Sequence, residues 1–252
     1  LRLNILNKYV DNFVIVESIY NHKGEKRELK FNPKKFGNFK DKIIYLIYDE
    51  IPSEVESISD NELENEKSGK LIMNALHRES GQRNFIINGL KNANSEDIIL
   101  ISDVDEIPNL ENIIFDKIKK KIIFFNQDML YYKFNLKLPN LTWTGTRGCK
   151  KKYLKSPQWI RNIKDRKYPF YRLDALFSEK KFISCEIIKN GGWHFTNIKT
   201  AIEIQHKLRS YLHHIEFDKN PLTIDKINEI IKNKKAIYNL TADKRQDKFE
   251  GS

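Results

Sequence analysis

The sequence is poor in cysteine, with only Cys149 and Cys185 in 252 residues. Two widely separated thiols do not make a disulfide framework, and they are too few for a zinc site built from thiolates alone. A reducing compartment is the simplest one for such a chain. We therefore expect a cytoplasmic protein.

Long apolar runs and linkers are missing as well. No stretch approaches the roughly 20 apolar residues that cross a bilayer, so no transmembrane segment is expected. No basic-then-apolar leader is visible. The chain starts without Met at a stretch that reads like the inside of an element, and we expect a strand to precede it. The length fits one large α/β domain or two small ones, and the absence of repeats and linkers favours one.

Acidic residues are outnumbered, with 45 Lys and Arg against 34 Asp and Glu, a net charge of +11. Such a surplus is compatible with nucleic-acid binding. However, the lysines are scattered among abundant Asn and Ile, and the densest clusters (119–121, 150–152 and 232–235) are short and lie in different segments. We expect no specific nucleic-acid partner. A phosphorylated ligand or an anionic membrane face suits this charge better.

Apolar periodicity predicts alternating strands and helices. The pattern in residues 139–180 is irregular, aromatic and basic, which suits substrate contacts. The whole order indicates an α/β fold with antiparallel additions in the second half. Strands are predicted at 9–18, 43–48, 98–102, 122–126 and 130–138, and helices at 71–90, from 108 to about 118, from 200 to about 215 and at 224–231.

The most informative stretch is ILISDVDEIP, where an apolar run ends in three carboxylates within four positions. Such carboxylates repel one another and are costly to desolvate, and a hard divalent cation relieves both problems. Strand side chains alternate, so Asp103 and Asp105 fall on one side of an extended backbone and can share Mg²⁺ or Mn²⁺. The simpler alternative is a pair of loop carboxylates, one of which caps a helix starting near Pro108.

A glycine pair precedes an aromatic and a histidine in NGGWHFT, residues 190–196. Gly192 lets the backbone approach a ligand closely, Trp193 offers a stacking face, and His194 can ligate a metal or donate to phosphate. The alternative is a glycine turn that enters a buried strand with a hydrogen-bonded core histidine.

A second glycine-containing motif is WTGTRG, residues 143–148. It combines an aromatic platform at Trp143, a flexible loop at Gly145 and a guanidinium suited to phosphate at Arg147. An ordinary loop with a solvated arginine is the alternative.

Taken together, VDNFVIVES, QRNFI, ILISDVDEIP, WTGTRG, GGWHFT and LHHIEF resemble glycosyltransferase family 17, named for β-1,4-mannosyl-glycoprotein 4-β-N-acetylglucosaminyltransferase. The motifs follow in order from about Leu3 to Phe217. The resemblance implies a GT-A fold, with a mixed central sheet flanked by helices, a nucleotide-sugar donor, a glycan acceptor and inversion at the anomeric carbon. The animal members use UDP-GlcNAc and act on the core mannose of N-glycans. This chain lacks their membrane anchor and cysteine usage, which leaves its acceptor open.

The resemblance also implies roles for individual residues. Asp105 would hold the cation that neutralises the diphosphate leaving group, with Asp103 on the metal or the ribose and His194 as a third metal contact. Glu17, at the end of the first strand, is expected to meet the uridine, and the alternative is a solvated strand-end carboxylate. Arg83 is expected to address phosphate, or else to be a surface helix residue.

An inverting transfer needs a carboxylate that takes the proton of the acceptor hydroxyl. Asp174 and Glu216 are the candidates; the sequence does not choose between them, and we prefer Asp174. Within a single catalytic domain we expect a nucleotide-binding half at about 1–108, an acceptor-side half at 109–220, and a C-terminal helix and tail at 221–252.

Two other classes of protein stay open at this point. A strand followed by D-x-D also opens haloacid-dehalogenase-type phosphatases, in which the first Asp is a nucleophile. Those carry the motif near the N-terminus and follow it with Thr or Val and a Gly, whereas here residues 106–108 are Glu-Ile-Pro. A non-catalytic sugar- or nucleic-acid-binding protein on a transferase scaffold would leave the acidic cluster as an ordinary exposed loop.

Overall fold

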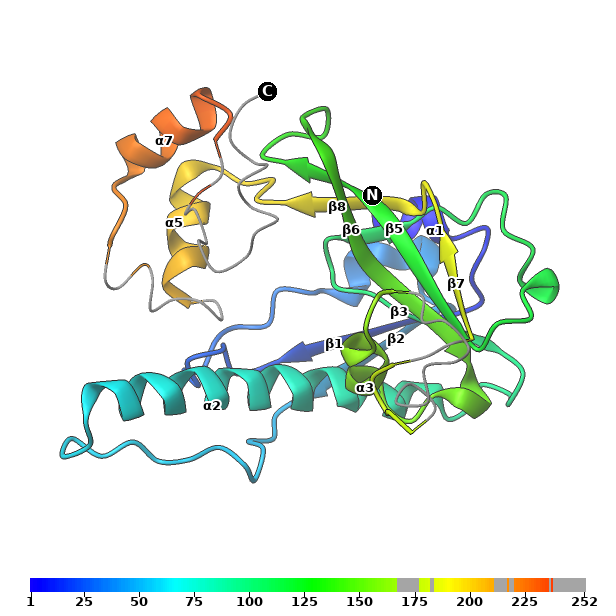
Figure 1. Ribbon diagram of the computed structural model, residues 1–252, viewed down its shortest axis with the longest axis horizontal. Coiled ribbons are helices and arrows are strands. Elements are labelled where there is room, and N and C mark those ends of the chain that lie inside the picture. Colours follow the sequence, from blue (N-terminus) through cyan, green and yellow to red (C-terminus); the bar gives the residue numbers. More distant parts are fainter. Residues whose placement is uncertain (167–176, 182–183, 211–216, 218–219, 236, 238–252) are drawn as a thin grey trace. The chain divides into compact units, whose positions relative to one another are not determined.

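A computed structural model of the chain describes residues 1–166, 177–181, 184–210, 217, 220–235 and 237 (Figure 1). These residues form two compact units. The first consists of Leu1–Val10 and Asn92–Ile198 with the described residues from Lys234 onward, and the second of Asp11–Lys91 and Lys199–Asn233. The expected division into a nucleotide-binding half and an acceptor-side half stays a prediction.

The first unit is built on a six-stranded mixed sheet with the order β3-β6-β5-β8-β4, and β7 also pairs with β5. Its pairs are antiparallel except for β5 with β7 and β5 with β8. The strands are β3 (Ile98–Ile101), β4 (Glu106–Pro108), β5 (Ile122–Tyr131), β6 (Lys137–Lys150), β7 (Cys185–Ile188) and β8 (Gly192–Thr196). Its helices are α1 (Arg2–Leu6), η3 (Phe115–Lys117), η4 (Lys151–Tyr153) and α3 (Pro157–Asn162).

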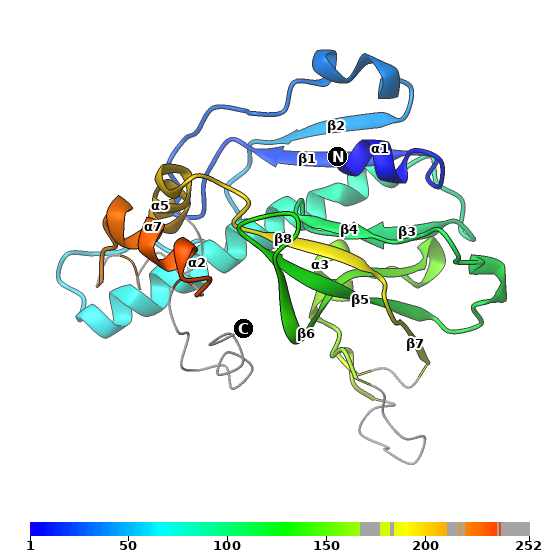
Figure 2. The same ribbon diagram turned by 90° about the horizontal axis from the view of Figure 1, so that it is seen from above.

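This sheet curls, because β3 and β4 lie at opposite ends of the strand order yet are joined by residues 102–105 alone. A connection of four residues spans at most about 15 Å, so the two edges must approach each other. β3 and β4 run along the same side of the curled sheet (Figure 2). The acidic motif therefore lies where the sheet nearly closes.

Several predicted elements of this unit are corrected by the structure. The helix expected from Pro108 is absent from the described residues, because Glu106–Pro108 pairs with β8 instead and only the short turn η3 follows. The strand predicted at 122–126 continues to Tyr131 as β5, and the strand predicted at 130–138 is broken by a turn at residues 132–136, where Tyr132 has φ of 62°, before β6 begins at Lys137. Residues 139–150, expected to be irregular, belong to β6.

The core of the first unit is formed by the continuous apolar start of β5. Its four residues 122–125 are fully buried, which suits a central strand that pairs on both edges. Cys149 on β6 and Cys185 on β7 are buried and free of disulfides.

The second unit contains two parallel strands, β1 (Phe13–Ser18) and β2 (Ile43–Tyr48), aligned from Phe13 opposite Ile43 to Ser18 opposite Tyr48. The helix predicted at 71–90 is α2 (Glu64–Asn84), which continues as η2 (Phe85–Leu90). The other helices are η1 (Pro33–Phe39), α5 (Ala201–Ser210) and α7 (Ile224–Lys232).

The predicted capping box before α5 is confirmed. The Thr200 amide donates to the Glu203 carboxylate at 2.8 Å, and the Glu203 amide donates to the Thr200 hydroxyl at 3.3 Å. The helix thus begins where its sequence predicts.

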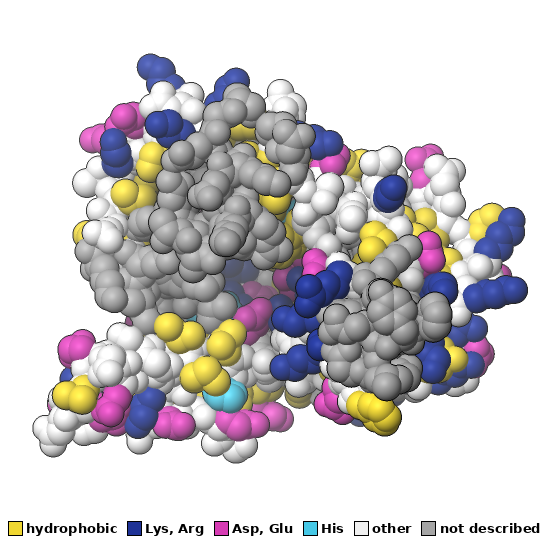
Figure 3. All heavy atoms as spheres, viewed as in Figure 1, with side chains coloured by type: hydrophobic (Ala, Val, Ile, Leu, Met, Phe, Trp, Pro, Cys, Tyr) yellow, Lys and Arg dark blue, Asp and Glu magenta, His cyan; other side chains and the backbone are white. Residues whose placement is uncertain are grey.

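Basic side chains on the visible face are spread out and interspersed with acidic ones (Figure 3), which agrees with a compositional bias. Among the helices of the described residues, none combines the length and the apolar character that a membrane span requires.

Candidate active site

The acidic motif forms a turn and not the extended segment that the sequence predicted. The Glu106 amide donates to the Asp103 carbonyl at 3.1 Å, which closes the turn. Arg2 holds this turn from α1, since its Nη1 donates to the carbonyls of Asp103 and Glu106 at 2.6 and 2.8 Å. The side chains of Asp103 and Asp105 remain about one third exposed. Both are accessible to a ligand, but the alternation argument that paired them was wrong.

The third carboxylate of the motif, Glu106, is completely buried. Arg161 meets it as a fork, with Nη2 at 2.9 Å from Oε1 and Nη1 at 3.0 Å from Oε2. Trp143 donates its Nε1 hydrogen to Oε1 at 3.0 Å, and the Asp103 amide donates to Oε2 at 3.0 Å. A buried carboxylate with this many donors is satisfied inside the protein. Glu106 is thus the buried counter-ion of Arg161.

Arg161 is a site residue that the sequence reasoning missed. Its Nη2 also donates to Asp103 Oδ2 at 2.8 Å, and its Nη1 donates to the Gly145 carbonyl. The arginine is carried by α3, a short helix that is capped by the Ser156 hydroxyl and begins with Pro157. The signal in the sequence was this Ser-Pro helix start, inside a region that we predicted to be irregular.

Arg147, expected to bind phosphate, is instead turned toward α3. Its Nη1 donates to three carbonyls at the end of that helix, those of Ile160, Arg161 and Ile163. Burial, and then the nearby Arg161 charge, lower the pKa of Arg147 to about 10. The alternative of a solvated loop arginine is therefore wrong. Arg147 fixes the backbone that carries Arg161, and its phosphate role stays a prediction.

His194 on β8 connects the two glycine-containing motifs. Its imidazole stacks on the Trp143 indole, with ring centroids 5.1 Å apart and planes 17° apart. Its Nδ1 lies 3.3 Å from Thr196 Oγ1 and 3.0 Å from Met129 Sδ, while Nε2 lies 3.5 Å from Asp105 Oδ1. The imidazole thus has Thr196 and Met129 at its Nδ1 side and the Asp105 carboxylate at its Nε2 side.

These contacts favour one tautomer of His194. The Thr196 hydroxyl donates to the Met129 sulfur at 3.2 Å, which leaves its oxygen to accept from the imidazole Nδ1–H. In this neutral tautomer the Nε2 lone pair lies toward Asp105, so two acceptors face each other. A cation between them relieves the repulsion, and imidazole with carboxylate suits Mn²⁺ or Mg²⁺.

The donor set for such a cation is small. Among the described residues, no group of three or more His, Cys, Asp or Glu side chains could hold a metal ion. Two protein ligands are still compatible with Mg²⁺-type chemistry, in which water and substrate phosphates complete the coordination. The residues therefore fit a cation that binds together with an anionic substrate.

A buried polar cluster lies beneath the acidic turn. The Thr146 amide donates to Gln127 Oε1 at 3.2 Å, and the hydroxyls of Ser102 and Thr146 lie 2.8 Å apart. Gln127 and Thr146 are completely buried on β5 and β6, and Ser102 follows β3. These bonds tie three strands together directly below the candidate site.

The predicted glycines serve this packing. A Cβ on Gly145 would lie 1.8 Å from Gln127 Oε1 and 2.9 Å from Glu106 Cδ. Gly192 has φ of +120°, and a Cβ there would lie 2.1 Å from the Ile107 carbonyl. The close approach that we expected toward a ligand is thus made toward the protein itself. Trp193 is half-buried on β8, and its stacking role stays a prediction.

A family model for glycosyltransferase family 17 matches residues 1–245 of the 252-residue chain. The chain belongs to glycosyltransferase family 17. It is therefore an enzyme, a glycosyltransferase of the N-acetylglucosaminyltransferase-like class, whose substrates are a nucleotide-sugar donor and a glycan acceptor. No curated protein and no solved structure matches the chain. The family resemblance inferred from the motifs is confirmed, and the phosphatase alternative is set aside.

Two predicted donor-binding residues of this glycosyltransferase lie in the second unit. Glu17 accepts from the amides of Lys30 and Phe31 at 2.8 and 3.0 Å and from the Tyr45 hydroxyl at 2.9 Å. Burial opposes its charge, but these bonds and Arg27 leave its pKa below the ordinary value. Glu17 is therefore not the solvated carboxylate of the alternative, and its role toward uridine stays a prediction.

Arg83 lies near the end of α2, where it pairs with Glu79 one turn earlier at 2.5 Å. With a side chain only 12% exposed, Arg83 is not the surface helix residue of the alternative, and its phosphate role stays a prediction. Both catalytic-base candidates of the glycosyltransferase, Asp174 and Glu216, lie outside the described residues.

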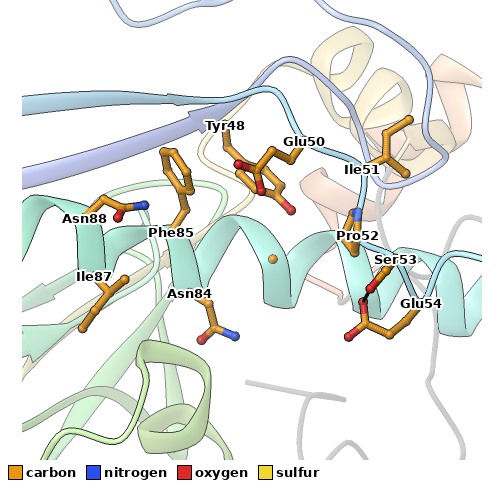
Figure 4. Close-up of a pocket in the computed structure, with 11 residues that line it drawn as sticks. Tyr48, Glu50, Ile51, Pro52, Ser53, Glu54, Asn84, Phe85, Ile87 and Asn88 are labelled. Carbon is orange, nitrogen blue, oxygen red and sulfur yellow. Dashed lines mark hydrogen bonds between the residues drawn. The ribbon is translucent and has the colours of Figure 1, made fainter.

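The second unit also has an open hollow of about 520 Å³ at the end of β2 (Figure 4). Tyr48 and Phe85 form its aromatic wall, with ring centroids 5.2 Å apart. Glu50 and Glu54 on its rim would repel a diphosphate, so the hollow suits a neutral group such as a base or a sugar better. The remaining lining residues are Ile51, Pro52, Ser53, Gly81, Asn84, Ile87 and Asn88.

Proposed function

We propose that this protein is a metal-dependent, inverting glycosyltransferase that transfers GlcNAc from UDP-GlcNAc to a glycan acceptor. Family membership supports the reaction class. The metal dependence is supported by one observation above all, the His194 Nε2 that faces Asp105 Oδ1 at 3.5 Å on an accessible turn.

Asp105 and His194 are the residues that would hold Mn²⁺ or Mg²⁺, and Asp103 lies beside them. A bound divalent ion would stabilise the negative charge on the departing nucleoside diphosphate. The chain's own residues orient this site. Trp143 fixes the imidazole plane by stacking, and Thr196 fixes its tautomer from the other side.

Inversion at the anomeric carbon needs a general base on the acceptor side. We assign this role to Asp174, with Glu216 as the second candidate. The base accepts the proton of the acceptor hydroxyl as its oxygen attacks the sugar on the face opposite the diphosphate. Replacing each carboxylate by its amide and measuring transfer under single-turnover conditions distinguishes the two.

The fold and location belong to the same proposal. A GT-A-type fold is supported by the parallel strands β1 and β2 and by a carboxylate turn that follows an apolar strand. A cytoplasmic location is supported by the two cysteines, which are both buried and not linked in a disulfide.

Calorimetric titration with UDP, with and without Mn²⁺, tests the proposal. We expect UDP to bind in the presence of Mn²⁺ and to bind much more weakly without it. Asp105→Ala should remove the metal-dependent part and the transfer activity while thermal unfolding stays cooperative. If a folded protein binds UDP with the same affinity with and without Mn²⁺, the proposed metal dependence is contradicted. A thermal-shift screen across nucleotide sugars then identifies the donor, and a preference other than UDP-GlcNAc contradicts that assignment.

A further inference from the structure

We propose that Arg161 is a positioning residue that withholds Asp103 from the metal, so that the two aspartates of the motif have different tasks. Asp105 binds the cation together with His194, whereas Asp103 is bound by the guanidinium of the buried Arg161–Glu106 ion pair. The inference rests on the proposed metal-dependent function and assigns the protein ligands within it.

The geometry separates the two aspartates clearly. Arg161 Nη2 lies between two carboxylates, 2.8 Å from Asp103 Oδ2 and 2.9 Å from Glu106 Oε1. Its side chain is only 10% exposed and that of Glu106 is not exposed at all. The bonds between Arg161 and Glu106 lie in this dry setting and are stronger than bonds at a surface, whereas the Asp103 side chain is 37% exposed. Asp103 is therefore held by a partner that cannot move toward solvent.

Arg161 itself is fixed from three directions. The Glu106 carboxylate accepts hydrogen bonds from both Nη1 and Nη2 of Arg161. The Gly145 carbonyl also accepts from Nη1, and Arg147 donates to the backbone carbonyl of Arg161. The planar guanidinium has a rigid fork geometry, so these contacts leave it one orientation. That orientation directs Nη2 at Asp103.

A metal ion competes with Arg161 for Asp103. A cation at Oδ2 would meet the guanidinium charge at hydrogen-bond distance and would have to break a charge-assisted bond. Asp105 Oδ1 instead lies 3.5 Å from His194 Nε2, and in the neutral Nδ1–H tautomer a cation between these two atoms removes a repulsion. Electrostatics thus favours the cation on Asp105 and His194.

Metal affinity, read from the electron paramagnetic resonance signal of free Mn²⁺, tests this division without relying on turnover. Asp105→Asn should weaken Mn²⁺ binding by at least about tenfold, whereas the matched Asp103→Asn should change it by less than about threefold. Both substitutions are isosteric. Comparable losses in the two variants overturn the inference while leaving the metal site in place. Failure of the native protein to bind Mn²⁺ overturns the proposed metal dependence itself, and the inference with it.

A second experiment releases Asp103 from its partner. The double variant Glu106→Gln, Arg161→Met replaces a neutral ion pair by neutral side chains, so the net charge is kept and Asp103 loses its guanidinium. Mn²⁺ should then bind more tightly than to the native protein, and adding Asp103→Asn should abolish that gain. Thermal unfolding identifies whether the double variant is folded. Unchanged or weaker Mn²⁺ binding in the folded double variant contradicts the inference. If the double variant is unfolded, the comparison of Asp105→Asn with Asp103→Asn decides the inference.

Discussion

The indole of Trp143 lies almost flat against the imidazole of His194, with 17° between the two ring planes. Its other functional group, the Nε1 hydrogen, goes to the buried carboxylate of Glu106. One aromatic side chain on β6 therefore connects the candidate metal ligand on β8 to the ion pair below it. We expected Trp143 to be a platform for the donor, but one of its faces packs on the protein.

The hydrogen bond from Trp143 can be tested separately from the stacking. Trp143→Phe keeps a ring against His194 but removes a donor from a fully buried carboxylate oxygen. We expect the free energy of unfolding, measured by urea denaturation, to fall by about 1–3 kcal/mol. Trp159→Phe is the matched control, because its Nε1 donates to the Glu179 carbonyl at the surface. Equal losses in the two variants would show that the Glu106 contact contributes nothing specific.

The tautomer of His194 gives a second prediction. Thr196→Val removes the oxygen that accepts from Nδ1–H, and the imidazole is then free to place its hydrogen on Nε2 toward Asp105. We expect Mn²⁺ affinity to fall by about tenfold, because outer-shell partners of metal-binding histidines typically contribute that much. Isothermal calorimetry measures the affinity.

Thr144→Val is the control for that change. Thr144 donates to Asn126 within the same sheet at 3.1 Å, and its hydroxyl contacts neither His194 nor Asp105 in any described bond. Mn²⁺ affinity should stay at the native value in this variant. A tenfold loss in both variants would point to a general effect on the sheet and against the tautomer argument.

The ion pair beneath the turn predicts a large cost when only one partner is removed. Arg161→Met leaves the Glu106 carboxylate buried without its guanidinium, and the free energy of unfolding should fall by about 3–5 kcal/mol. The double variant with Glu106→Gln should recover much of that loss. A double-mutant cycle by urea denaturation measures the coupling, and additive losses would contradict a direct interaction.

Much of the fold could be predicted from local sequence patterns. The β-branched runs of β1, β2 and β3 and the capping box of α5 are local signals, and the structure agrees with them. The failures came from tertiary pairing. Glu106–Pro108 carries a plausible helix start, but the partner strand β8 lies more than 80 residues away and makes it a strand. Single-sequence patterns do not contain that pairing.

The residue types of the candidate site could be predicted from the sequence, but the contacts among them could not. Asp105 and His194 were named together, and the structure brings them within 3.5 Å. Arg161 was missed because the Ser-Pro start of its helix lies in a basic region that we predicted to be irregular, and only the fold shows the buried Glu106 beside it. Gly145 was interpreted as a flexible loop and Gly192 as space for a ligand, since sequence alone does not show which atoms fill the space beside a glycine.

The glycine at the start of β8 tests that correction. Gly192→Ala requires a positive φ for a residue with a side chain and a contact of 2.1 Å with the Ile107 carbonyl. We expect a loss of about 3 kcal/mol or more in the free energy of unfolding. Gly69 in α2 is the control, because nothing lies within 4 Å of the position that an alanine Cβ would take, and alanine there should stabilise by about 0.5–1 kcal/mol. A tolerated Gly192→Ala would mean that β4 and β8 are not packed so closely.

The buried Glu17 predicts a pH-dependent contribution to stability. Its pKa is lower in the folded protein than in the unfolded chain, so its stabilisation is present above the unfolded value and is lost as pH falls through the folded value. Glu17→Gln should lower the free energy of unfolding by about 1–3 kcal/mol at pH 7, and by progressively less below the ordinary glutamate pKa of 4.5. Urea denaturation across this range measures the difference. Glu64→Gln, whose side chain is 91% exposed, is the control and should change the free energy of unfolding little at pH 7. A pH-independent loss in Glu17→Gln would indicate that packing, and not the charge, holds residues 30 and 31 against β1.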